Sequence, residues 1–195
     1  ISHAVTRGLN PNAPLKPSGI EWLGDIPAHW KPTPLKHITR IGNGSTPHRE
    51  TPEYWAETGF PWLNSSVVNS RVVTEPEGFV TERALRECHL PIVRPPAVLV
   101  GITGQGRTRG MAAMLGIEAT INQHVAYVKP RTPELDVEFL LRVMEMAYRK
   151  LREDSEEAGA TKGAITCEQI ADLRIPLPPL SEQRAIVAHL DAATA

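Results

Sequence analysis

Cysteine and long hydrophobic runs are both scarce in this sequence of 195 residues. The two cysteines, Cys88 and Cys167, lie far apart and in no spacing typical of metal ligands. They favour neither a disulfide framework nor a zinc site, so a reducing, cytoplasmic setting is expected. Because no run approaches the roughly 18 apolar residues of a membrane span, we expect a soluble protein that does not engage a membrane. The chain starts at Ile1 without a signal-type segment, so we expect a fragment of a longer protein.

Motifs for common catalytic chemistries are missing as well. No lysine has an acidic residue two positions before it, as common metal-dependent nucleases need, and neither Pro-Pro pair fits an amino-methyltransferase motif. The seven histidines show no paired metal-ligand spacing, and no nucleophile elbow occurs. We therefore expect a protein that binds rather than catalyses, with no catalytic residue, no metal site and no cofactor.

The composition is that of one globular domain, with 41% hydrophobic and 22% charged residues. A net charge of −1 gives no overall argument for a nucleic-acid partner. The charges are unevenly distributed, however. Residues 28–49 and 88–117 contain no Asp or Glu, whereas acidic residues gather at 75–87 and 134–157. This segregation predicts a cationic face, with chance clustering on a solvated surface as the alternative.

A glycine-rich loop at residues 101–110 is the most informative segment. It follows an apolar, β-type run at residues 97–100 and contains four glycines among polar and cationic side chains. Because glycine lets the backbone approach a ligand closely, the loop is suited to binding phosphates or base edges. The candidate contact residues in it are Thr103, Gly104, Gln105, Gly106, Arg107, Thr108 and Arg109.

Two other interpretations of the glycine-rich loop stay open. The pattern Gly101-x-x-x-x-Gly106-Arg107-Thr108 differs from a nucleotide-binding P-loop in having arginine where that motif has lysine. A P-loop opens a helix of several turns, whereas the further glycine at Gly110 favours a hairpin. The second alternative is a structural turn that binds nothing.

Three further polar segments have side chains suited to contacting nucleic acid. They are the loop 42–49, the polar turn that ends an apolar run at 61–68, and the tripeptide at 122–124. Asn and Gln match the adenine edge in the major groove, and the alternative is that Asn122 or Gln123 satisfies buried backbone groups. With one lysine from the polar loop 157–166, the candidates are Ser45, Thr46, His48, Arg49, Asn64, Ser65, Asn122, Gln123, His124 and Lys162.

Local patterns predict a mixed α/β (α+β) domain with irregular, twisted strands. A capping box at Thr166 and Gln169 predicts a brief helix, and Ser181 is expected to cap a C-terminal helix. That last helix has an apolar stripe of Ile186, Val187 and Leu190. The remaining elements are expected as helices at 1–7, 81–88 and 135–151, the last long and amphipathic, and as strands at 97–100, 111–115 and 121–128.

Five motifs cover nearly the whole chain. They are WLGDIPxxW at 22–30, GSTP at 44–47, the glycine-rich loop, TINQH at 120–124 and IPLPPLSEQRAIV at 175–187. In this order they resemble the specificity subunit of type I DNA restriction-modification enzymes. The most specific motif is the last, which in that family opens a helix of a conserved region.

The resemblance implies a division of the chain into three parts. Residues 1–18 would be the end of a central spacer helix with its linker, residues 19–174 a DNA target-recognition domain, and residues 175–195 the start of a distal conserved helix that begins a spacer arm. Such a domain reads one half of a bipartite site in double-stranded DNA and is not catalytic. The flanking helices space two such domains and dock methyltransferase subunits, and the restriction subunit joins through the complex.

The N-terminal helix implies that this is the second of two recognition domains. Half-sized subunits that dimerise exist in the family and are the alternative. A separate alternative is that the chain is chiefly an assembly module, in which Ile186, Val187 and Leu190 contact a partner helix.

Overall fold

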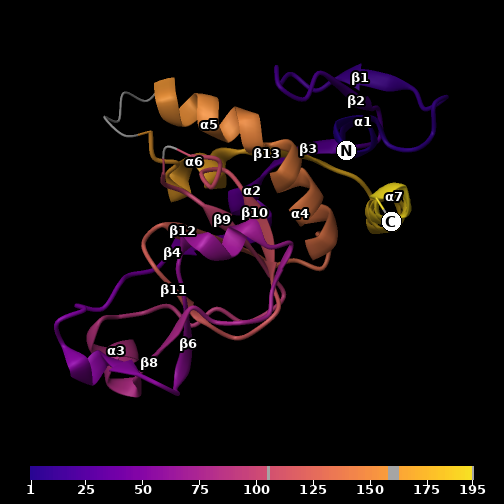
Figure 1. The fold of residues 1–195 in the computed structure, drawn as a ribbon. Helices are drawn as coiled ribbons and strands as arrows, with labels where there is room; N and C mark the ends of the chain where they lie inside the picture. The colour runs from indigo at the N-terminus through magenta and orange to yellow at the C-terminus, as the bar shows by residue number, and fades with distance from the viewer. Residues whose placement is uncertain (105, 158–162, 195) are drawn as a thin grey trace.

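The structure is a computed structural model that describes residues 1–104, 106–157 and 163–194. In Figure 1 both chain termini lie at the end of the molecule that holds β1, β2 and α7, and α3 lies at the opposite end. Between these ends lies a central sheet, with α4 and α5 to one side of it. The mixed α/β class expected from the sequence is confirmed.

The central sheet has five strands in the order β4-β12-β9-β10-β7. Neighbouring strands are antiparallel except β10 and β7, which are parallel. The middle strand, β9, is buried along its whole length, which explains its continuous apolar run. The strand bounds are β4 Thr39–Asn43, β7 Val72–Val73, β9 Ala97–Gly101, β10 Ala112–Leu115 and β12 Val125–Pro130.

Each face of the central sheet has its own hydrophobic core. On one face, Val98 and Val100 of β9 pack in a core with α4 (Val137–Met146). On the other face, Leu99 packs in a core with Val67 of the 3-10 helix η2 (Ser65–Asn69). Successive side chains of a strand point to opposite faces, so β9 is held from both sides. This fixes the position at which the glycine-rich loop leaves the sheet.

A second, smaller sheet has the strand order β11-β6-β8-β5. Together with α3 (Glu82–Glu87) it encloses a small core that includes Trp62 and Val80. β11 pairs in parallel with β6 and is followed closely by β12, so the chain passes between the two sheets at residues 122–124. The elements are η1 Pro52–Tyr54, β5 Trp55–Ala56, β6 Phe60–Leu63, β8 Gly78–Val80 and β11 Thr120–Ile121.

Short helices and two strand pairs complete the fold. β1 pairs with β2, and β3 pairs with β13. No helix within the described part of the chain has both the length and the apolar character that crossing a membrane needs. The bounds are α1 Ser2–Arg7, β1 Leu15–Pro17, β2 Asp25–Pro27, β3 Lys31–Pro34, α2 Leu35–Ile38, α5 Tyr148–Glu157, α6 Cys167–Asp172, β13 Arg174–Leu177 and α7 Leu180–Thr194.

Two short helices predicted from local patterns are present, as α3 and α6. The Thr81 hydroxyl accepts a bond from the N–H of Ala84 at the start of α3. Thr166 and Gln169 form the expected capping box of α6. Gly8, with φ of 72°, follows α1 as expected.

Three predicted elements differ from the structure. The single helix expected over 135–151 is two helices, α4 and α5, separated at Ala147. The strand expected over 121–128 is interrupted by a turn between β11 and β12. Ser181 is not the residue that precedes the last helix, because α7 begins one residue earlier, at Leu180.

Most of the apolar stripe on α7, which the alternative assembly role assigned to a partner helix, is buried within the chain itself. Ile186 is 1% and Leu190 6% exposed, and both lie in the same core as residues of α1 and α4, with Val187 packed against it. Gln183 of α7, also buried, donates to the carbonyls of Glu134 and Pro178. The chain itself therefore covers this stripe.

Candidate nucleic-acid interface

The glycine-rich loop is the tip of a β-hairpin. It joins β9 to its antiparallel neighbour β10, and the N–H groups of Gly101 and Gly110 donate to the carbonyls of Met111 and Gly101 at 2.9 and 2.7 Å. Gly104 and Gly110 have φ of 110° and 88°, a backbone region that glycine adopts without strain. Because a returning strand follows the loop, and not a helix, the P-loop alternative does not fit.

Backbone hydrogen bonds bring the predicted polar segments together. The N–H of Gly44 donates to the carbonyl of Asn122, and the N–H of Ile102 donates to the carbonyl of His124, at 3.2 and 3.0 Å. The N–H of Asn122 donates to Leu63, directly before the polar turn at 64–65. The turn 122–124 therefore connects the loop 42–49, the turn 64–65 and the glycine-rich loop.

Three of these segments, at residues 64–69, 103–108 and 124, line an open, polar hollow of about 490 Å³. Its wall has hydroxyl, amide and imidazole side chains together with glycine backbone. Such groups can donate and accept hydrogen bonds without adding net charge. The lining residues are Asn64, Ser65, Ser66, Asn69, Thr103, Gly104, Gly106, Thr108 and His124.

A chain of side-chain hydrogen bonds crosses three of the segments. The Thr46 hydroxyl donates to Oε1 of Gln123 at 2.6 Å. The amide nitrogen of Gln123 lies 3.3 Å from Nε2 of His124, whose Nδ1 lies 2.9 Å from the hydroxyl of Thr103. Ser45 is held by its backbone, whose N–H donates to the carbonyl of Ile121.

Asn122 has a structural role. Its side chain is 5% exposed, and Oδ1 accepts a bond from the N–H of His124 at 2.9 Å. The structure therefore favours the alternative in which Asn122 satisfies buried backbone, whereas Gln123 beside it is exposed. Asn64 is also engaged: it accepts from the N–H of Ser66 while its amide nitrogen lies 3.4 Å from Glu77.

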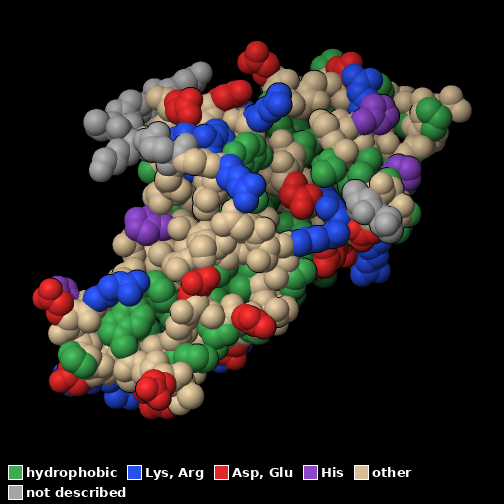
Figure 2. Space-filling model, in the orientation of Figure 1, with side chains coloured by type: hydrophobic (Ala, Val, Ile, Leu, Met, Phe, Trp, Pro, Cys, Tyr) green, Lys and Arg blue, Asp and Glu red, His purple; other side chains and the backbone are tan. Residues whose placement is uncertain are grey.

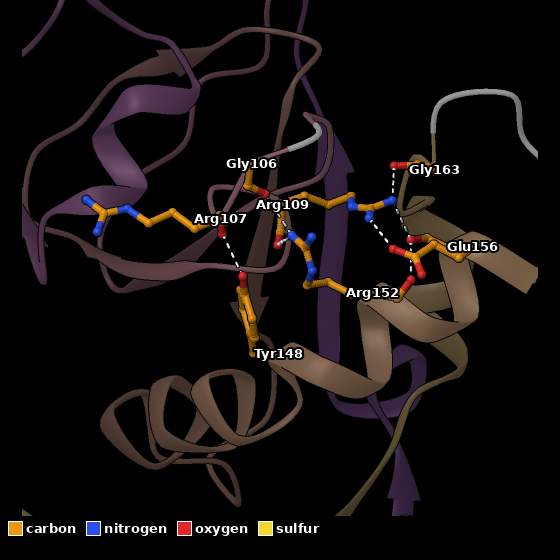
Figure 3. Close-up of polar contacts among 8 residues, drawn as sticks. Gly106, Arg107, Arg109, Tyr148, Arg152, Glu156 and Gly163 are labelled. Carbon is orange, nitrogen blue, oxygen red and sulfur yellow. Dashed lines mark hydrogen bonds and ion pairs between the residues drawn. The ribbon is translucent and has the colours of Figure 1, made fainter.

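The structure corrects the assignment of Arg109 to the contact surface. This side chain is 3% exposed and points toward α5, away from Arg107 (Figure 3). Its guanidinium donates to the Ser155 hydroxyl at 3.1 Å, to the Gly163 carbonyl at 2.5 Å and to Glu156 at 2.6 Å. Arg109 therefore holds the end of the loop in place and is not available to bind a ligand.

Two residues of α5 that sequence reasoning missed hold the backbone of the same part of the loop. Tyr148 donates from its hydroxyl to the carbonyl of Arg107 at 3.0 Å, and Arg152 donates to the carbonyls of Gly106 and Arg109 at 2.8 and 2.9 Å (Figure 3). The Arg152 guanidinium also lies over the Tyr148 ring, 5.4 Å from its centroid. Their four-residue spacing on one helix was the available signal.

Arg107 is the exposed cation of the hairpin tip. Figure 3 shows its side chain extending away from α5. Within the described residues, no hydrogen bond or ion pair engages its guanidinium. Gln105 and Lys162, two other candidates, lie outside the described residues.

The loop 42–49 is braced by tryptophans. Arg49 is exposed, with its guanidinium 5.4 Å from the centroid of the Trp55 ring and 5.8 Å from that of Trp62. The Trp55 indole N–H donates to the carbonyl of His48. A cation over aromatic rings is a stable surface arrangement, so the two rings hold Arg49 in place, and no ion pair engages it among the described residues.

The expected cationic face is reduced by pairing. Lys36 and Arg94 form ion pairs with Asp172 and Glu118 at 2.7 and 2.9 Å, and Arg109 is buried. On the face drawn in Figure 2, acidic and basic side chains are interspersed, with no continuous basic surface among the described residues. The described residues also contain no group of three or more side chains suited to hold a metal ion.

Comparison with known structures identifies the class of fold. The HsdS subunit from Thermoanaerobacter tengcongensis superposes with a TM-score of 0.63 at 24% identity, over 94% of this chain and 39% of that one. The S subunit of the type I restriction-modification system from M. genitalium superposes with 0.61 at 16% identity, over 85% of this chain and 40% of that one. This is the mixed α/β fold found in specificity subunits.

Sequence comparison gives the family. A family model described as the type I restriction modification DNA specificity domain matches residues 27–195. The specificity subunit of the type I restriction enzyme EcoR124I/EcoR124II from Escherichia coli is 22% identical over 163 residues, which are 83% of this chain and 40% of that subunit. The chain belongs to the family of type I restriction-modification DNA specificity domains and holds a single target-recognition domain. It spans about 40% of the length of the relatives it matches.

Proposed function

We propose that this chain recognises one half of a bipartite site in double-stranded DNA as part of a type I specificity subunit. The observation that supports this most strongly is the convergence of three polar segments, far apart in sequence, on one hollow in a member of the specificity-domain family, with the loop 42–49 bonded to one of them at Asn122. Neutral amides and hydroxyls suit base edges, and exposed arginines suit phosphates.

The proposed contact residues follow from exposure and position. Thr103, Gly104, Gly106, Thr108 and His124 line the hollow together with Asn64 and Ser65, and Arg107 extends from the hairpin tip. Ser45, Thr46, His48 and Arg49 lie on the adjoining loop. Arg109 and Asn122 are left out of direct contact because both are buried.

The proposed organisation has three parts. Residues 19–174 form the recognition domain, residues 1–18 are the end of a spacer helix with its linker, and residues 175–195 are the start of a distal helix. The packing of α1 and α7 against α4 supports a fixed orientation between these end helices and the domain. If this is the second of two recognition domains, the central spacer helix would end at α1.

The proposed partners are methyltransferase subunits, with the restriction subunit joining through the complex. In this scheme the chain itself is not catalytic, and the assembly works on DNA in the cytoplasm. One similar structure, with a TM-score of 0.62 and 25% identity, comes from work on complex assembly in the type I R-M system. This supports a role within such a complex.

Replacing the recognition domain of a related subunit with residues 19–174 tests the proposal. The expected result is a new half-site in the methylation pattern of the host DNA, because the domain that reads that half has changed while the rest of the complex has not. A control transplant rebuilds the recipient's own domain through the same junctions. An active complex that keeps the recipient's target in full would contradict the proposal.

A further inference from the structure

The turn between β11 and β12 holds one amide side chain in a fixed direction at the surface. Gln123 is exposed, yet both polar atoms of its amide are already engaged. Oε1 accepts from the Thr46 hydroxyl at 2.6 Å, and Nε2 lies 3.3 Å from Nε2 of His124. An exposed glutamine ordinarily samples several rotamers, so contacts at both ends reduce that freedom before any ligand arrives.

The hydrogen-bond directions within this chain of side chains are determined by chemistry. Because the amide nitrogen of Gln123 can only donate, Nε2 of His124 must accept. The proton of the neutral ring then lies on Nδ1, which donates to the Thr103 hydroxyl at 2.9 Å. Thr46 and Thr103, from two different loops, therefore fix the orientation of the amide between them.

The backbone under Gln123 is equally constrained. Asn122 is buried and accepts from the N–H of His124, and its own N–H donates to the carbonyl of Leu63. The carbonyl of His124 accepts from the N–H of Ile102 at the root of the glycine-rich loop. The turn is thus tied to both sheets, so the amide has a fixed base as well as fixed neighbours.

The remaining hydrogen-bonding sites of the Gln123 amide indicate which ligand it can bind. An amide oxygen accepts two hydrogen bonds and an amide nitrogen donates two, so Gln123 keeps one acceptor site and one donor site on the same amide group. In the major groove, adenine presents N7 as an acceptor beside N6–H₂ as a donor. Guanine presents two acceptors there and offers no donor to the glutamine oxygen.

From this geometry we infer that Gln123 reads an adenine in the major groove, with Thr46, His124 and Thr103 acting as positioning residues. The inference rests on the proposed function and adds the base and the residue that reads it. Within the proposed contact surface, it gives the Thr46 and Thr103 hydroxyls the role of orienting this amide.

The test uses the full-length subunit assembled with its partner subunits. The half-site is first identified from the methylation pattern, and each of its adenines, on either strand, is then replaced in turn by 7-deazaadenine in a synthetic duplex. This change removes only the N7 acceptor and keeps base pairing. At one adenine the wild-type complex is expected to bind about tenfold more weakly, and the Gln123→Ala complex is expected to show no further loss at that same position.

Two matched sets of variants separate positioning from general structure. Thr46→Val and Thr103→Val are expected to lower the discrimination between adenine and other bases at that one position, and Thr46→Ser and Thr103→Ser are expected to restore it, because serine keeps the hydroxyl. Asn12→Ala, which changes an exposed asparagine near the N-terminus, serves as the control and leaves the discrimination unchanged.

The outcomes distinguish this inference from the proposed function. If the complex binds its target but no adenine couples to Gln123, or if the half-site contains no A·T pair, the inference is overturned and the proposed function stands. If residues 19–174 do not determine any half-site, the proposed function itself fails.

Discussion

The two sides of the glycine-rich loop differ in charge and burial. On the α5 side, Arg109 is buried and bonded to three partners, and Arg152 donates to two loop carbonyls. On the hollow side, Thr103 and His124 are partly buried, bonded to each other, and next to open space. The same short hairpin therefore has one side held by charged groups and one side lined by neutral polar groups.

This difference separates fixing the loop from binding through it. If the Arg109 guanidinium moved away, it and its buried partners would lose their hydrogen bonds, which is unfavourable in free energy. Arg109 is therefore held in place. Hydroxyls and amides keep spare hydrogen-bonding capacity after they have bonded to each other. Variants on the α5 side should therefore lower stability, and variants on the hollow side should alter DNA binding with little change in stability.

The largest expected effect is that of Arg109→Met. The substitution keeps the side-chain stem but removes the bonds to Ser155, Glu156 and the Gly163 carbonyl, so we expect the free energy of unfolding to fall by about 2–4 kcal/mol. Urea unfolding of the 195-residue chain measures this.

Arg107→Met is the matched control, since the same change is made two residues away at an exposed position. We expect its effect on the free energy of unfolding to stay within about 0.5 kcal/mol. Equal losses for the two variants would remove the distinction between the two sides of the loop.

Tyr148→Phe tests the α5 side with a single hydroxyl. Its hydroxyl donates to the Arg107 carbonyl at 3.0 Å, and its removal should lower the free energy of unfolding by about 1 kcal/mol. Tyr127 is a half-buried tyrosine whose hydroxyl has no hydrogen bond among the described residues, so Tyr127→Phe is the comparison and should change little. A larger loss of unfolding free energy for Tyr127→Phe would count against a stabilising role of the Tyr148 hydroxyl.

The predictions that came true from sequence rest on short-range physics. In the capping box of α6, Thr166 and Gln169 bond to backbone N–H groups three positions away, so the local sequence contains all the information. The hairpin at residues 101–110 likewise followed from glycine spacing between two apolar runs. The polar segments were found because their residue types are unusual in an apolar context.

The failures involve contacts between distant parts of the chain. Arg107 and Arg109 have the same side chain two positions apart, and only the packing of α5 makes one exposed and the other buried. The stripe on α7 looked unpartnered because α4, which covers it, lies far away in sequence. The acids that pair with the expected cationic segments come from outside those segments, as Asp172 does for Lys36.

Arg107→Ala tests the exposed tip of the hairpin, where the effect should appear only in binding. If this arginine neutralises one phosphate, the logarithmic salt dependence of DNA binding by the assembled complex should flatten by about one unit. A fourfold rise in salt would then weaken the wild type about fourfold more than the variant, whichever DNA sequence is used. An unchanged slope would make the hairpin tip a structural turn.

The smallest expected effect concerns a second paired arginine, at the junction of α4 and α7. Hydrogen bonds from Arg71 and from the buried Arg142 lower the pKa of the Asp191 carboxyl. A carboxyl whose pKa is lower in the folded state stabilises the fold above its unfolded pKa of about 3.9, and this contribution is lost as the pH falls through the folded pKa. The stability difference between the wild type and Asp191→Asn should therefore be present at neutral pH and shrink below about pH 4, as measured by urea unfolding across that range.

Asp25→Asn, at an exposed aspartate with no ion pair among the described residues, provides the baseline. A difference that stays constant into acid would mean that the charge of Asp191 does not secure α7.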